Sequence, residues 1–134
     1  MVTKTRVMPK ILVVDDEPDA VELIDFNLKA AGYDVVTAAD GNEALKKARS
    51  SLPDLIVLDL IMPEVNGFDV VAALNEHSDT ARIPVLVVTA KRITDEDRAR
   101  LDGYVAAIME KTEFQRDLFT AEVRRATARR PLVA

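Results

Sequence analysis

The chain has 134 residues, of which 49% are hydrophobic and 31% charged, a composition typical of one globular domain rather than a disordered segment. The net charge of −5 argues against binding of duplex DNA through bulk charge, because neutralising phosphates requires a clustered basic surface. The absence of cysteine excludes disulfides and thiolate metal sites, and no apolar run approaches the roughly 18 residues of a membrane span. We therefore expect a cytoplasmic protein that does not contact a membrane.

The first half of the chain alternates short apolar runs with amphipathic segments. Strands are predicted over residues 10–14, 33–38 and 55–58, since residues 11–14 and 55–58 form continuous apolar runs, as in strands covered on both faces. Helices are predicted between them, from Pro18 to Gly32 and over residues 41–50, because apolar residues recur there at helical spacing. A third helix is expected around residues 68–74, after a loop at residues 62–67.

The second half continues the same alternation. A strand is predicted over residues 85–88, ending at Thr89, and another over about 105–110, ending at Lys111. Between them, Thr94 with Asp97 three residues later predicts the N-terminal cap of a helix that Gly103 stops. A last helix is predicted from Phe114 to about residue 130.

Five strands that alternate with helices imply a parallel sheet with right-handed crossovers. The predicted fold class is therefore α/β, a doubly wound five-stranded parallel sheet in a three-layer sandwich. We expect one domain over residues 9–130, preceded by an extension at 1–8 and followed by a tail at 131–134.

Polar residues end four of the predicted strands. Asp15 and Asp16 follow the first strand, Asp59 the third, Thr89 the fourth and Lys111 the fifth. Because sites in open parallel sheets form at the carboxyl ends of the strands, these side chains are expected to converge at one edge.

Three carboxylates in one place repel each other, at ~4 Å by on the order of 4 kcal/mol per pair for an effective dielectric near 20. Lys111 offsets one charge, and the remainder suits a hard divalent cation such as Mg²⁺. Thr89 and Lys111 are able to bind phosphoryl oxygens, and one aspartate would be the nucleophile that forms an acyl phosphate. Spacing alone does not decide which aspartate this is.

The motifs resemble those of a two-component response-regulator receiver domain. The resemblance rests on residues 12–17 (LVVDDE), residues 59–67 (DLIMPEVNG, the D-x-x-M-P-x-x-N-G pattern), Thr89-Ala90 and Lys111, and it covers residues 9–130. It implies a flavodoxin-like (βα)5 fold and a phosphorelay role. The domain would catalyse its own phosphorylation and dephosphorylation without being an enzyme for a separate substrate.

The resemblance also implies roles for single residues. Asp59 would be the phosphorylated residue, and it would bind Mg²⁺ together with Asp16 and the main-chain carbonyl of Ile61. Asp15 would act mainly through a metal-bound water. Thr89 would be the switch hydroxyl, and Lys111 would pair with the phosphoryl oxygens.

The implied partners are a histidine kinase or histidine phosphotransfer protein and a downstream effector protein. Since few residues follow residue 130, we expect no output domain and no direct contact with nucleic acid. A monomer or weak homodimer is expected.

Two positions depart from the family pattern. Thr112 follows Lys111 where many receivers carry a proline after a cis peptide bond, so the loop after the fifth strand is expected to be built differently. Ile108 stands where many receivers carry a tyrosine or phenylalanine that relays phosphorylation, and the nearby Tyr104 is out of register.

Other functions fit these residues less well. A phosphatase of the haloacid dehalogenase type needs D-x-D, but Ile61 stands two residues after Asp59; a dinucleotide site needs G-x-G-x-x-G after the first strand, which is missing. A pseudo-receiver that binds without phosphorylation is disfavoured by the complete acidic set. His77 is expected at the surface, and the arginines near the C-terminus form either a solvated helix face or a partner-docking surface; these are Arg124, Arg125, Arg129 and Arg130.

Overall fold

Five parallel strands form one sheet in the order β2-β1-β3-β4-β5, in a computed structural model that describes residues 8–128. The strands are β1 (Lys10–Val14), β2 (Asp34–Ala38), β3 (Leu55–Leu58), β4 (Val85–Thr89) and β5 (Ala107–Glu110). The helices are α1 (Pro18–Ala30), α2 (Gly41–Ser51), α3 (Gly67–Asn75), α4 (Ser78–Ala81), α5 (Asp95–Leu101) and α6 (Arg116–Ala128), with a 3-10 turn η1 (Lys111–Glu113).

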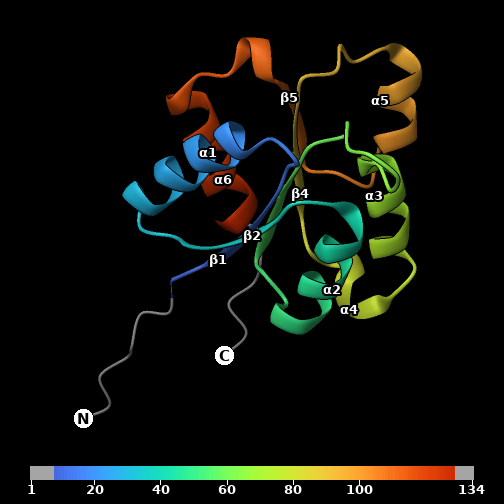
Figure 1. Ribbon diagram of the computed structural model, residues 1–134, viewed down its shortest axis with the longest axis horizontal. Coiled ribbons are helices and arrows are strands. Elements are labelled where there is room, and N and C mark those ends of the chain that lie inside the picture. The colour runs from blue at the N-terminus through green and yellow to red at the C-terminus, as the bar shows by residue number, and fades with distance from the viewer. Residues whose placement is uncertain (1–7, 129–134) are drawn as a thin grey trace.

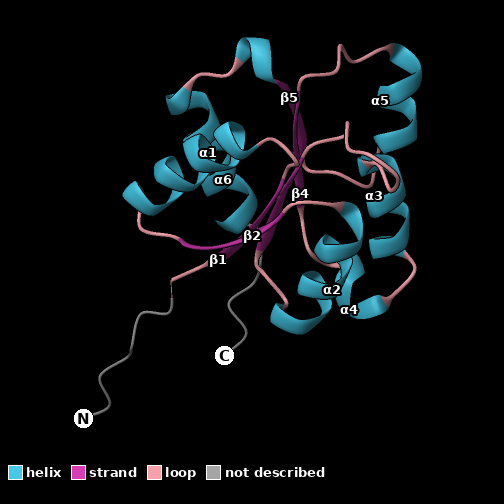
Figure 2. Ribbon diagram, in the orientation of Figure 1, coloured by secondary structure: helices cyan, strands magenta, loops and turns pink. Residues whose placement is uncertain are grey.

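The helices cover both faces of the sheet and make three layers. Helices α1 and α6 lie on one face, and α2 to α5 lie on the other, with the sheet seen between them (Figures 1 and 2). Inward-facing side chains alternate along β1: Leu12 and Val14 join the core under α2, α3 and α5, whereas Ile11 and Val13 pack with Phe119 of α6. The predicted fold class is confirmed, because strands buried on both faces read as continuous apolar runs.

The structure corrects three details of the predicted elements. A one-turn helix, α4, follows α3, held by the buried hydroxyl of Thr80, which donates to the Leu74 carbonyl at 2.7 Å. Strand β5 begins at Ala107, two residues later than expected, and α6 begins at Arg116 rather than Phe114. The turn η1 comes first, and Phe114 instead packs against Phe119 with ring centroids 5.2 Å apart.

Helix starts follow the predicted capping chemistry. Thr94 and Asp97 form a reciprocal capping box at α5, as expected, and Asn66 and Asp69 form another at α3. His77 is exposed, in agreement with its predicted place at the surface. None of the helices within residues 8–128 has the length and hydrophobicity that a bilayer-spanning segment needs.

Candidate functional site

Four of the predicted site residues meet at the carboxyl edge of the sheet. Asp15 follows β1, Asp59 follows β3, Thr89 ends β4 and Lys111 follows β5. The Thr89 hydroxyl lies 2.7 Å from Asp59 Oδ1, and Lys111 Nζ lies 2.7 Å from Asp15 Oδ2. Residues that are far apart in sequence therefore share one site because the parallel strands end side by side.

The carboxylate of Asp59 is buried and held by three donors. Its Oδ1 accepts hydrogen bonds from the Thr89 hydroxyl and, at 3.1 Å, from the Ile61 backbone N–H. Its Oδ2 lies 3.4 Å from Lys111 Nζ. These contacts fix the orientation of the carboxylate in this structure.

Lys111 is the cation around which the acids gather. Besides Asp15 and Asp59, its Nζ contacts Glu17 Oε1 at 3.0 Å. Partial burial lowers the pKa of Lys111, but hydrogen bonds to Asp15 and Glu17 and the charge of Asp59 outweigh burial, so its pKa is raised above the usual value. The ammonium group therefore stays charged throughout the physiological range.

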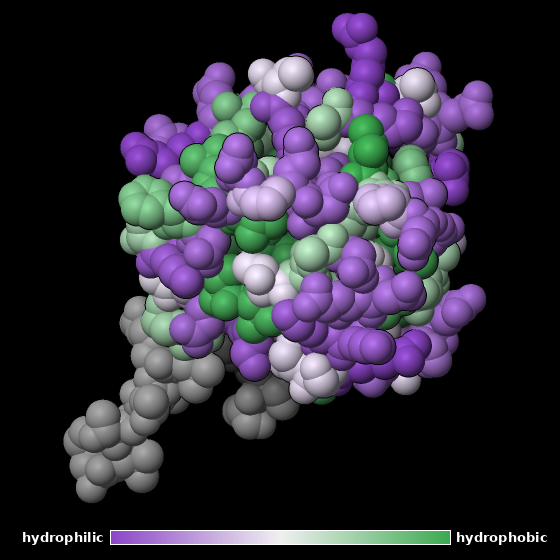
Figure 3. Space-filling model, viewed as in Figure 1, coloured by the Kyte–Doolittle hydropathy of each residue, from purple (hydrophilic) through white to green (hydrophobic). Residues whose placement is uncertain are grey.

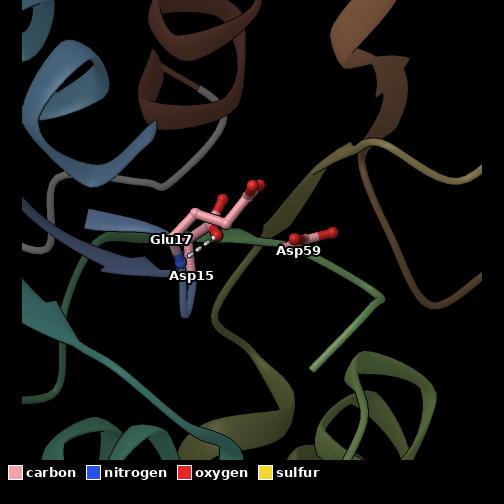
Figure 4. Close-up of side chains that lie close together, drawn as sticks. All are labelled: Asp15, Glu17 and Asp59. Atoms are coloured by element: carbon pink, nitrogen blue, oxygen red, sulfur yellow. Dashed lines mark hydrogen bonds between the residues drawn. The ribbon is translucent and has the colours of Figure 1, made fainter. Parts of the chain in front are cut away.

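Three acids lie close enough to share a cation. Carboxylate oxygens of Asp15, Glu17 and Asp59 lie within 4.8 Å of one another. Figure 4 shows Asp15 and Glu17 side by side, joined by a 2.9 Å bond from the Glu17 N–H to Asp15 Oδ1, with Asp59 approaching from another strand end. Burial raises the pKa of Asp15 and outweighs the hydrogen bonds from Lys111 and the Glu17 N–H, which lower it.

This donor set fits a hard divalent ion, because it offers only carboxylate oxygens, the ligand type that Mg²⁺ prefers. Asp16, by contrast, is exposed and lies outside the group, so the ligand role predicted for it stays a prediction.

Sequence reasoning missed Glu17, although its place next to the two aspartates and just before α1 was a usable signal. The side chain of Ile61 is 52% exposed; the ligand expected there is its carbonyl.

The loop from Asp59 to α3 depends on a glycine. A Cβ added at Gly67 would lie 2.5 Å from the Asp59 carbonyl oxygen and 2.6 Å from the Leu60 Cα, closer than atoms tolerate. The Gly67 N–H donates to the Leu60 carbonyl at 3.0 Å. The start of α3 therefore packs directly against the backbone of Asp59.

The two departures from the family pattern have visible consequences. The peptide bond between Lys111 and Thr112 is trans, as are all those among residues 8–128, and the chain turns through η1 instead. Ile108 lies in the edge strand β5 and packs against the cluster under α5.

Comparison with known proteins agrees with this geometry. The model of the response regulator receiver domain matches residues 11–123. The chain belongs to this family. It is 51% identical over 82 residues to the alkaline phosphatase synthesis transcriptional regulatory protein PhoP of Bacillus subtilis, a match that covers 61% of this chain and 33% of PhoP. It is 48% identical over 83 residues to the DNA-binding dual master transcriptional regulator RpaA of Synechocystis, covering 62% and 34%.

Solved receiver structures superpose on nearly the whole domain. The chemotaxis protein CheY4 of Vibrio cholerae aligns with a TM-score of 0.82 at 31% identity, covering 90% of this chain and 99% of CheY4. The receiver domain of a signal transduction histidine kinase from Syntrophus aciditrophicus aligns with a TM-score of 0.81 at 26% identity, covering 94% and 97%. This receiver has the phosphoacceptor role of its family in two-component signalling. The matched segment spans about a third of the curated relatives PhoP and RpaA.

Proposed function

We propose that this receiver takes a phosphoryl group from the phosphohistidine of a partner histidine kinase or phosphotransfer protein onto Asp59. The observation that carries the proposal is the set of contacts on one buried carboxylate. Asp59 accepts bonds from Thr89 and from the Ile61 amide, and it also lies against Lys111. Asp15, the other buried acid of this edge, is already paired with Lys111 at 2.7 Å.

The transfer forms one bond and breaks another. A carboxylate oxygen of Asp59 attacks phosphorus, the phosphorus–nitrogen bond breaks, and the histidine nitrogen leaves with the electron pair, giving an acyl phosphate. Lys111 pairs with phosphoryl oxygens and offsets their charge. The Thr89 hydroxyl donates its proton in a hydrogen bond to another phosphoryl oxygen.

The acidic group supports Mg²⁺ as the cofactor. Asp15, Asp16, Asp59 and the Ile61 carbonyl would hold the ion, and Glu17 lies close enough to join them. When bound, Mg²⁺ neutralises charge on the incoming phosphoryl group. The residues of this chain then position the acceptor and keep Lys111 beside it.

Helix α1 offers a docking surface for the protein that carries the phosphohistidine. It begins three residues after Asp15 and exposes Leu23 and Phe26, which are 52% and 66% accessible. On the face shown in Figure 3, hydrophilic side chains dominate and hydrophobic ones lie between them in small patches. Two large exposed apolar groups one helical turn apart form an apolar contact surface on the helix that follows Asp15.

The remaining parts of the proposal concern the wider protein. The receiver catalyses hydrolysis of its own acyl phosphate, acts in the cytoplasm as a monomer or weak homodimer, and signals to an effector protein. The domain comprises residues 9–130. The absence of direct nucleic-acid contact stays a prediction for this domain, because PhoP and RpaA are transcriptional regulators about three times as long as the matched segment.

The test is treatment with acetyl phosphate, with and without Mg²⁺, followed by intact mass measurement. The wild-type protein is expected to gain one phosphoryl group that is acid-labile and depends on Mg²⁺. Asp59→Asn should remove this gain, whereas Asp34→Asn, at the opposite end of the strands, should not. Wild-type labelling of the Asp59→Asn protein would refute the assignment.

A further inference from the structure

The loop between β4 and α5 (residues 90–94) is tied to the acceptor site at one end and to α5 at the other. The Lys91 N–H donates to the Thr89 hydroxyl oxygen at 3.1 Å, and the same hydroxyl donates to Asp59 at 2.7 Å. Lys91 Nζ lies 2.5 Å from Asp97 Oδ2, which also accepts the Thr94 N–H at 3.1 Å. Lys91 thus joins the Thr89 hydroxyl, through its backbone, to the N-terminal cap of α5, through its side chain.

The Lys91–Asp97 ion pair is better sheltered than an ordinary surface pair. The two side chains are 33% and 10% exposed. The hydrogen bond from Lys91, followed by that from the Thr94 backbone, lowers the pKa of Asp97. The carboxylate is therefore ionised at neutral pH and holds both the ammonium group and the first turn of α5.

Phosphorylation changes what the Thr89 hydroxyl can do. The hydroxyl has a single proton, which it donates in a hydrogen bond to Asp59 in the unphosphorylated protein. A phosphoryl group adds charged acceptor oxygens that attract this proton more strongly. Any movement of the hydroxyl toward them pulls on the N–H of Lys91, whose side chain is anchored on Asp97.

We propose that Lys91 is a positioning residue whose ion pair with Asp97 stabilises the unphosphorylated arrangement of the loop and opens when Asp59 is phosphorylated. The inference rests on the proposed phosphorylation of Asp59 and adds how that event reaches α5. Because coupling between two sites is reciprocal, an ion pair that opposes the phosphorylated arrangement is itself weakened by phosphorylation.

A second tie connects the same loop to the edge strand. The Ile93 N–H donates to Glu110 Oε2 at 3.3 Å, so the loop is linked to β5 as well as to α5. The Arg100 guanidinium lies 4.0 Å from the centre of the Phe68 ring and links α5 to α3. The loop that carries Lys91 is therefore joined by hydrogen bonds both to β5 and to the start of α5.

The experiment measures the affinity for beryllium fluoride, a stable phosphoryl analogue, by calorimetry in the presence of Mg²⁺. Lys91→Met removes the ammonium group, and Asp97→Asn removes the charge while its amide oxygen still accepts the Thr94 N–H. Each variant is expected to bind the analogue about two- to fivefold more tightly, the range for a partly exposed ion pair. The double variant should bind no more tightly than either single variant.

Three controls separate positioning from a purely structural role. Lys91→Arg should restore wild-type affinity, and Lys29→Met, which breaks the Lys29–Asp25 pair on α1, should leave it unchanged. In a Thr89→Val background, Lys91→Met should have no effect, because the connection to Asp59 is already cut.

Unchanged affinity in both single variants, additive effects in the double variant, or the same effect in the Thr89→Val background would overturn the inference. A wild-type protein that binds no beryllium fluoride and takes no phosphoryl group from acetyl phosphate would instead overturn the proposed function.

Discussion

Thr89 donates its hydroxyl proton to Asp59 Oδ1 at 2.7 Å, although the two residues are 30 positions apart. The bond joins the ends of β3 and β4, which are neighbours in the sheet. Thr89 is fully buried, so water does not compete for the hydroxyl. The bond therefore sets the direction in which the Asp59 carboxylate points.

Replacing Thr89 should slow phosphorylation without unfolding the domain. Thr89→Val keeps the shape of the side chain but removes the donor, and a hydrogen bond to a charged group is worth about 1.5–3 kcal/mol. We expect the rate of labelling by acetyl phosphate to fall by roughly tenfold or more. Thr89→Ser, which keeps the hydroxyl, should stay close to the wild-type rate in the same mass-spectrometric time course.

Lys111 is expected to stabilise the fold as well as the phosphoryl group. Lys111→Met leaves the carboxylates of Asp15 and Asp59 without their cation, and we expect the free energy of unfolding to fall by about 1–3 kcal/mol. Urea denaturation at neutral pH measures this change. In an Asp15→Asn background the loss should be smaller, and an equal loss there would show that the pair with Asp15 contributes nothing to this stabilisation.

The acids after β1 should contribute unequally to Mg²⁺ binding. Glu17 is already neutralised by Lys111, whereas Asp16 makes no ion pair with the residues that the structure describes. If Asp16 binds the ion as the family resemblance implies, Asp16→Asn is expected to weaken Mg²⁺ binding about tenfold, because one carboxylate ligand is lost. Glu17→Gln should change the dissociation constant less.

Calorimetric titration with Mg²⁺ distinguishes these variants, with Asp19→Asn, in the first turn of α1, as a control. A larger loss in Glu17→Gln than in Asp16→Asn would assign the ion to the group formed by Asp15, Glu17 and Asp59.

Gly67→Ala should disturb the acceptor loop. The added Cβ would lie 2.5 Å from the Asp59 carbonyl oxygen, so the backbone must move. We expect a loss of about 1–3 kcal/mol in unfolding free energy together with slower labelling of Asp59. Gly103→Asn is the matched control, since a Cβ there meets nothing within 4 Å and asparagine tolerates the positive φ of 84°. Wild-type stability and labelling of Gly67→Ala would contradict the close approach.

Phe26→Ser should separate docking from chemistry. Because Phe26 is 66% exposed and belongs to neither buried cluster, the variant should fold normally. Phosphotransfer from a histidine kinase that labels the wild-type protein should fall by roughly tenfold, in line with loss of an aromatic contact at an interface. Labelling by acetyl phosphate should not change. Equal loss with both donors would place Phe26 in the chemistry and not in docking.

Most of the fold could be predicted because its physical causes are local. Residues 11–14 form a continuous apolar run, as expected for a strand covered on both faces, and Thr94 with Asp97 carries its own capping chemistry. Helix α4 could not be predicted, since four residues are too few for a periodic pattern and its hold is the buried contact from Thr80 to Leu74. The delayed start of α6 likewise follows from the turn after Lys111 and the packing of Phe114.

The convergence of Asp15, Asp59, Thr89 and Lys111 also followed from sequence, because strand order alone brings the carboxyl ends of parallel strands together. The partners of each side chain did not. Which acid lies beside Lys111 depends on how the chain turns after Val14, and this turn places Glu17 in contact while leaving Asp16 exposed. The Lys91–Asp97 pair is equally a product of loop geometry. A residue pattern shows which side chains a segment must bury. The ion pairs and hydrogen bonds between side chains depend on the path of the loops, which only the packed tertiary structure determines.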